Sequence, residues 1–261
     1  MTKALYSPSR GKFTLALIVF GLSQLCNADM ITGFVYNMQS FEKDYEEIHH
    51  INELIHEVNY KNLEGERFAN KVINYSSGLS TPSIDFNNSH CDESYQIKSQ
   101  SGSNKVQSFY SNSCDDNKSQ GKIRMESPYV VDAGFDHFIR QNLSTIETKT
   151  LSFDYPSPSR SSNISLKAKS FSCKKLIKDL STLLSQIDTN HNNKSQWQRC
   201  VMVRANNWFI AQFLPAIYLA YDNDGFLALY TGRSNMSDKD GKYQDIAIFY
   251  HLENPISKQG Q

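Results

Sequence analysis

Residues 208–250 place the strongest constraint on the fold, because apolar runs alternate there with turn-forming tetrapeptides. The runs IYLAY and FLALY flank Asp222-Asn223-Asp224-Gly225, which is a strong hairpin signal. A second polar turn at residues 237–241 precedes a last apolar run, YQDIAIFY. Pro215 marks a break, since proline cannot donate to a strand ladder. The block predicts the central strands of an antiparallel sheet.

The composition supports a mainly β (α+β) fold. The chain has 261 residues, 39% of them hydrophobic, with 14 Tyr and 15 Phe. Aromatic residues favour pleated, half-buried surfaces, and this length suits one large domain. We therefore expect a single β-rich domain over residues 29–252, followed by a disordered tail at 253–261.

Earlier segments show the same strand signals more weakly. Strands are expected at 32–38, 67–75, 122–126, 151–155, 164–168 and 199–204, with a hairpin around 95–110. Residues 44–60 fit two strands, with a helix as the alternative. Polar loops are expected at 115–121 and 188–196, and a Ser/Gly/Pro turn cluster at 76–83.

Two segments carry helical periodicity. Residues 132–147 place an apolar stripe at helical spacing, and Asp132 is positioned to cap the N-terminus. Residues 174–187 repeat the pattern with Ile177, Leu180, Leu184 and Ile187 on one side. We expect the first helix to pack against the sheet through Phe138.

The first 28 residues have the pattern of a Sec signal peptide. Lys3, Arg10 and Lys12 precede an apolar run at 13–25, and small residues at Cys26 and Ala28 favour cleavage after Ala28. An uncleaved anchor is the alternative, although the run is short for a span of about 20 residues. A lipoprotein attached at Cys26 is a second alternative. The signal predicts a periplasmic or secreted protein with no membrane span after cleavage.

Four cysteines remain in the mature chain, an even number that suggests two disulfides in an exported protein. Of the three pairings, the sequential one is favoured because it closes two loops of similar size. It joins Cys91 to Cys114 and Cys173 to Cys200. No CxxC pair occurs, so zinc is not expected.

The sequence offers little catalytic chemistry. It lacks a GxSxG elbow and a phosphate-binding glycine loop, so no catalytic residue and no cofactor is assigned. Without its first 28 residues the chain has a net charge of −3, which disfavours nucleic acid as a partner. The motifs Asp222-x-Asp224-Gly225 and Asp238-x-Asp240-Gly241 are interpreted as turns rather than calcium loops.

A metal site is one interpretation of the cluster formed by His49, His50 and His56 with Glu46 and Glu47. On a straight strand His50 and His56 share a face but lie roughly 20 Å apart. A turn at Asn52 would let them pair across a hairpin. Solvated polar residues on a strand are the favoured interpretation, and no metal is expected.

Four stretches carry a resemblance: VVDAGFDHFIRQN at 130–142, LSFDYPSPSR at 151–160, EVNYKNLEGERFANKVINY at 57–75 and residues 215–250. They resemble a family of uncharacterised exported bacterial proteins. The resemblance implies a curled antiparallel sheet or half-barrel, similar to that of periplasmic lipoprotein carriers, with a helix in its concave face. It implies no catalytic residues. The polar insertions at 115–121 and 188–196 depart from the family.

These observations favour a non-catalytic protein of the periplasm that binds or carries a lipid or other apolar ligand. A curved sheet with one apolar face either fills its concave side or holds something there. A structural or protein-interaction component of the envelope is the alternative, and a hydrolase is less favoured. The expected apolar lining comprises Phe135, Phe138, Phe153, Trp208, Phe213, Leu219, Tyr221, Leu229 and Ile248.

Overall fold

A computed structural model describes residues 29–126, 128–187, 194–212 and 214–253, and this part of the chain forms one antiparallel sheet of 14 strands. The mainly β class is therefore confirmed. The strands are β1 (Asp29–Asn37), β2 (Lys43–Asn52), β3 (Ile55–Lys61), β4 (Arg67–Asn74), β5 (Ser83–Asn88), β6 (Glu93–Lys98), β7 (Lys105–Asn112), β8 (Asn117–Arg124), β9 (Leu151–Ser157), β10 (Ser162–Phe171), β11 (Arg199–Ala205), β12 (Ile217–Tyr221), β13 (Leu227–Arg233) and β14 (Asp245–Glu253).

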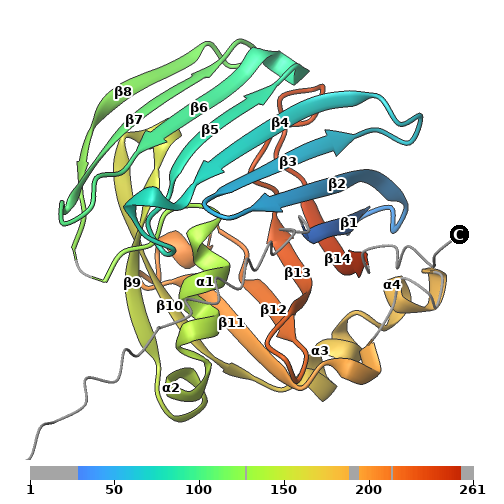
Figure 1. Cartoon of the computed structure of the whole chain (residues 1–261). Helices are drawn as coiled ribbons and strands as arrows, with labels where there is room; N and C mark the ends of the chain where they lie inside the picture. Colours follow the sequence, from blue (N-terminus) through green and yellow to red (C-terminus); the bar gives the residue numbers. More distant parts are fainter. Residues whose placement is uncertain (1–28, 127, 188–193, 213, 254–261) are drawn as a thin grey trace, which may run out of the picture.

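The sheet is a meander joined at its middle by the first and last strands. Its order is β8-β7-β6-β5-β4-β3-β2-β1-β14-β13-β12-β11-β10-β9. Strand β1 pairs with β2 on one side and with β14 on the other. The chain thus runs from the centre to one edge, crosses over, and returns from the other edge (Figure 1).

The sheet curls until its edges approach each other, so the strands nearly close into a barrel (Figure 1). No strand ladder joins β8 to β9 at the seam, which is held by side chains and by one isolated backbone bridge between Tyr129 and Asp154. Ser119 of β8 donates to the carbonyl of Pro158, just beyond β9, and the backbone N–H of Glu126 donates to the Asp154 carboxylate of β9. Pro156 is tolerated within β9 because an edge strand has a free side.

Alternation along the strands separates a concave inner face from a convex outer face. On β14, Ile246 and Ile248 join the inner cluster of the β1–β8 wall, whereas Ala247 and Phe249 contact the outer helices. A third cluster fills the inner side of β9–β12. Tyr230 packs against both inner clusters and links them.

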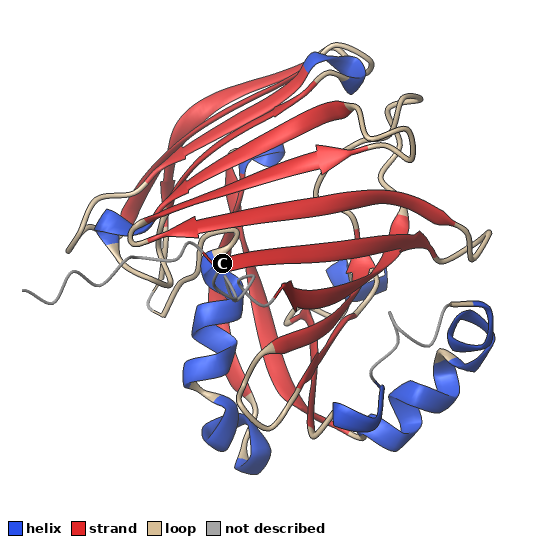
Figure 2. Cartoon of the chain, turned by 45° about the vertical axis from the view of Figure 1, so that its right-hand side comes forward, coloured by secondary structure: helices blue, strands red, loops and turns tan. Residues whose placement is uncertain are grey.

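Each expected helix is present but broken into two. The first comprises α1 (Gly134–Gln141) and α2 (Leu143–Thr148), and the second comprises α3 (Cys173–Asp179) and α4 (Ser181–Gln186). Helices α1 and α2 lie in the opening of the curled sheet, as expected, while α3 and α4 cover its outer face (Figures 1 and 2). The breaks fall at Asn142 and Leu180, where the backbone leaves helical geometry.

The expected cap at Asp132 is wrong. Ala133 occupies the N-cap position and makes no side-chain cap. The Asp132 carboxylate instead forms an ion pair with Lys71 of β4, at 2.9 Å, and accepts a hydrogen bond from Tyr95. A buried cation 61 residues earlier in the chain competes successfully with a local N–H for the same carboxylate.

Three other expectations need correction. The polar loop at 115–121 is wrong, because β8 begins at Asn117 and pairs with β7. The helical alternative for residues 44–60 is wrong, since β2 and β3 form a hairpin there. Strand β5 was missed. The signal peptide at 1–28, residues 188–193 of the second polar loop and residues 254–261 of the tail lie outside the described residues.

The two disulfides have the expected pairing, Cys91–Cys114 and Cys173–Cys200. The first joins the two hairpin ends that flank β6 and β7. The second fastens the start of α3 to β11, and so holds the outer helices against the sheet. Within the described residues, no helix has the length and hydropathy that a membrane-spanning helix requires.

Candidate functional site in the barrel interior

Ionisable side chains point inward from the wall formed by β2, β3 and β4. Because the pairing register aligns alternate residues, Glu47 and His49 of β2, His56 of β3 and Lys71 of β4 share the inner face with the buried Tyr60. Asp132, just before α1, reaches the same wall through Lys71. A barrel interior needs only apolar side chains to be filled, so this set requires an explanation.

Glu47, His49 and His56 form a continuous hydrogen-bonded chain. His49 Nε2 lies 3.2 Å from Glu47 Oε2, and His49 Nδ1 lies 2.9 Å from His56 Nε2. If Glu47 is ionised, His49 carries its proton on Nε2, and its Nδ1 accepts from His56. The hydroxyl of Tyr250 donates a second hydrogen bond to Glu47 Oε2, at 3.3 Å.

Gly33 makes room for this arrangement. A Cβ atom there would lie 3.0 Å from both Ile248 and the Tyr250 ring. Since Gly33 is paired with Glu47 and Tyr250 on the two neighbouring strands, its missing side chain leaves space where the tyrosine approaches the carboxylate.

The second inner group is the ion pair of Lys71 and Asp132, whose side chains are only 4% and 7% exposed. Tyr95 donates to Asp132 Oδ2 at 2.6 Å. The Lys71 ammonium also lies over the rings of Phe86 and Tyr95. The pair is therefore held by hydrogen bonds and aromatic faces, which offset the cost of burying two charges.

Burial dominates the electrostatics of this interior. It lowers the pKa of His56 to about 3, and electrostatic repulsion by neighbouring basic side chains, His49 and Lys71 foremost, lowers it further. Burial also raises the pKa of Tyr60, Tyr95 and Tyr250 well above the usual value, and the charges of Glu47 and Asp132 add to this effect. His56 is thus a neutral imidazole, and the tyrosines are hydrogen-bond donors and acceptors.

A separate buried network closes one end of the β1–β8 wall. Glu93 of β6, 1% exposed, accepts hydrogen bonds from the backbone N–H and hydroxyl of Ser237 and from the hydroxyl of Tyr243. Asn88 of β5 donates to the carbonyl of Ser237. These bonds fix the connection between β13 and β14 across the end of the wall, so we assign Glu93 a structural role.

The expected lining residues are divided between several places. Phe135, Phe138, Phe153, Leu219 and Tyr221 lie together in the cluster around α1, and Ile248 lies on the same face in the neighbouring cluster. Leu229 lies on the outer face beneath α3 and α4. Trp208 is 73% exposed in the β11–β12 connection. Phe213 is outside the described residues.

The histidines are the main feature that sequence reasoning interpreted wrongly. The turn does fall near Asn52, but His49 and not His50 faces His56, and both are largely buried, not solvated. His50 points outward. Among the described residues no group of three or more His, Cys, Asp or Glu has the arrangement of a metal site. The signal that would have found the pair is the spacing of His49 and His56 about a two-residue turn.

Fold and interior define this chain as a nearly closed antiparallel barrel with a polar patch on its concave wall. No protein-family model matches the chain, and no curated protein matches it. Among solved structures it is similar to the β-barrel-like protein of domain of unknown function DUF1849 from Brucella abortus. That comparison covers 87% of this chain and 98% of the other, with 4% identity and a TM-score of 0.33. These values mark a weak similarity.

Proposed function

We propose that this chain is an exported, non-catalytic protein of the periplasm that binds a lipid or another apolar ligand with a polar group. The observation that carries the proposal is the burial of Glu47, His49 and His56 on the concave wall, beside an aromatic interior. Small-ligand sites are typically apolar surfaces with a few polar groups that fix orientation. The inner face has this composition, with the α1 cluster as the apolar part and the β2–β3 wall as the polar part.

The absence of an evident nucleophile favours binding over catalysis. His49 and His56 contact each other and Glu47, but no hydroxyl or thiol nucleophile is bonded to either ring in the described residues. A hydrolase would need such a group within hydrogen-bonding reach of its base. The signal-peptide pattern of residues 1–28 and the two disulfides support export, because disulfides persist in oxidising compartments.

Native mass spectrometry of the protein recovered from a bacterial periplasm tests the proposal. We expect a mature chain that begins at Asp29, and a co-purifying species that organic extraction identifies as a lipid. The variant His49→Gln should retain less of that species, because it disrupts the polar chain on the inner face. The neighbouring variant His50→Gln is the matched control, since His50 points outward.

Two results would count against lipid binding. One is a protein that carries no apolar species before or after incubation with phospholipid vesicles. The other is equal retention in His49→Gln and His50→Gln, which would place the ligand away from the inner wall. Recovery of the chain in the cytoplasm, with residues 1–28 intact, would remove the periplasmic assignment.

A protein-interaction role in the envelope is the second candidate, and an exposed aromatic pair favours it. Trp208 and Phe209 are 73% and 57% exposed, with ring centroids 6.0 Å apart. Tryptophan is enriched among residues that dominate protein interfaces. Crosslinking in intact cells should then give adducts that the double variant Trp208→Ala with Phe209→Ala loses. The absence of any adduct from the unmodified protein would exclude this role.

A further inference from the structure

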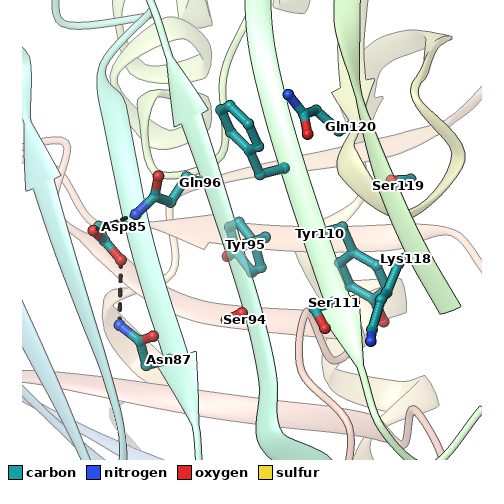
Figure 3. A pocket seen from close by; sticks show the side chains of 11 residues that line it. Asp85, Asn87, Ser94, Tyr95, Gln96, Tyr110, Ser111, Lys118, Ser119 and Gln120 are labelled. Carbon is teal, nitrogen blue, oxygen red and sulfur yellow. Dashed lines mark hydrogen bonds between the residues drawn. The ribbon is translucent and has the colours of Figure 1, made fainter. Parts of the chain in front are cut away.

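The outer face of β5–β8 contains a groove that the inner site does not explain. It has a volume of about 400 Å³, within the range of small-ligand sites. The outward-facing side chains that line it form two rows, and each row crosses the four strands (Figure 3). One row is Asn87, Ser94, Ser111 and Lys118, and the next is Asp85, Gln96, Phe109 and Gln120.

The shape of the groove follows from side-chain size. Ser94 and Ser111 are paired across β6 and β7, so the two shortest side chains lie together at the centre of the first row. Longer side chains flank them, with Asn87 on one side and Lys118 on the other. The result is a trough with a hydroxyl-lined floor, and the Phe109 ring is part of the adjoining row.

Three polar side chains of the trough orient one another through hydrogen bonds. Asp85 accepts from the amide of Gln96 at 3.0 Å and from the amide of Asn87 at 3.2 Å (Figure 3). Each amide therefore turns its NH₂ group toward Asp85 and its carbonyl oxygen away from it. Carboxylate, amide and hydroxyl groups held beside an aromatic ring match a ligand with many hydroxyls and an apolar ring face.

The same face carries an excess of positive charge. Exposed cations occupy the outward positions of β6, β7 and β8, and no acidic residue occupies an outward position on these three strands. The exposed cations are Lys98, Lys105, Lys118, Lys122 and Arg124. Along β8 the outward positions repeat about every 7 Å, so the charges form a line that leads away from the trough. Such a line attracts an extended anionic chain.

We propose that the outer face of β5–β8 binds an acidic oligosaccharide, with sugar hydroxyls on the serine and amide groups, a sugar ring on Phe109 and its acidic groups on the β8 cations. A single-stranded nucleic acid fits less well. Such ligands are usually held by several aromatic side chains in a row, whereas Phe109 is the one outward aromatic on β5–β8.

Binding measurements on the full mature protein test the proposal with four probes: an oligogalacturonate, its neutral methyl ester, inorganic phosphate and a single-stranded oligonucleotide of equal charge. We expect the oligogalacturonate to bind most tightly of the four probes. Its affinity should fall as the salt concentration rises. The double variant Lys118→Gln with Lys122→Gln should raise its Kd by about tenfold or more. Phe109→Leu should weaken the binding of the oligogalacturonate and of its methyl ester alike, because both ligands use the face of the Phe109 ring.

The control variant is Lys167→Gln with Lys169→Gln, which removes two lysines from the outer face of β10. It should leave the Kd unchanged. Thermal melting of each variant checks that the fold is retained. An equal loss of affinity in the control would overturn the proposal, because binding would then depend on total charge. So would an oligonucleotide that binds as tightly as the saccharide, binding of phosphate alone, or no binding of any probe. None of these outcomes bears on the lipid proposal, which concerns the opposite face.

Discussion

At the scale of single residues, His56 is a side chain that the folded protein keeps neutral. Burial on the inner wall disfavours its charged form, and repulsion from basic neighbours, which include His49 of β2, Lys71 of β4 and His137 of α1, disfavours it further. The pKa of His137 is lowered as well, again mainly by burial. Both histidines therefore bind protons less readily in the folded chain than in the unfolded one.

This difference predicts a loss of stability in acid. Between the unfolded pKa of 6.5 and the folded value of about 3, residue 56 binds a proton only in the unfolded state. The free energy of unfolding should thus fall as the pH falls, by up to about 1.4 kcal/mol per pH unit for one such group. Urea denaturation at a series of pH values measures the slope. His56→Gln should flatten it and His50→Gln should not, and equal slopes in all three proteins would refute the assignment.

The buried pair of Lys71 and Asp132 gives a second prediction. Lys71→Met leaves the Asp132 carboxylate buried without its cation, which costs about 3–5 kcal/mol. Adding Asp132→Asn removes the unpaired charge, so the double variant should regain a large part of that loss. Chemical denaturation of the two single variants and the double variant measures the coupling. Strictly additive effects would mean that the two side chains do not interact.

At the scale of elements, the position of α1 depends on a close backbone contact. A Cβ atom on Gly134, the first residue of α1, would lie 2.4 Å from the carbonyl oxygen of Ser80. Val131 also donates its backbone N–H to that carbonyl. The start of the helix is therefore held against the segment between β4 and β5, and this contact places Phe138 and Ile139 on the inner face of β9–β12.

Gly134→Ala should destabilise the protein by about 1–3 kcal/mol, because backbone atoms and not a flexible side chain obstruct the new methyl group. Gly121→Ala in β8 is the matched control, since its methyl group would meet only Ser161 side-chain atoms, at 3.5 Å or more. Thermal unfolding followed by circular dichroism compares the two. A Gly134→Ala protein as stable as the control would show that α1 can shift without cost.

Sequence periodicity predicted the elements well where each depended on neighbours in the chain. The hairpin at Asp222–Gly225 follows from its turn residues, and the run from Phe135 to Ile146 follows from its stripe. Strand β5 was missed because its alternation is short, with only Ile84 and Phe86 as apolar residues, and because it directly follows the turn cluster at 76–83. The break of the first helix at Asn142 was missed because the apolar stripe continues across it.

At the scale of the whole molecule, the seam is the part of the barrel that no strand ladder crosses. Strands β1 and β14 lie at the centre of the sheet with partners on both sides, whereas β8 and β9 each have one ladder partner. The seam relies on contacts such as those of Ser119 and Asp154. Isolated bonds of this kind close the sheet without the cooperativity of a ladder.

Hydrogen exchange should reveal this difference. We expect the amides of β8 and β9 to exchange faster than those of β1 and β14, because local opening at an edge breaks fewer bonds. Asp154→Asn should speed exchange at the seam further, since Glu126 N–H and Asn163 lose a charged acceptor. Exchange measured by mass spectrometry on peptides of the native protein resolves the strands. Uniform protection across the sheet would indicate a fully closed barrel.

The sequence by itself determined the mainly β class, most strand positions and the pairing of Cys91 with Cys114 and of Cys173 with Cys200. These features depend on local periodicity, turn chemistry and loop length, which can be read directly from the order of the residues. Tertiary structure decided the rest. It directs His49 rather than His50 inward, joins Lys71 to Asp132 across 61 residues and aligns Ser94 with Ser111 beneath the outer groove. Register between strands sets such contacts, and a shift of one residue would turn each side chain to the opposite face.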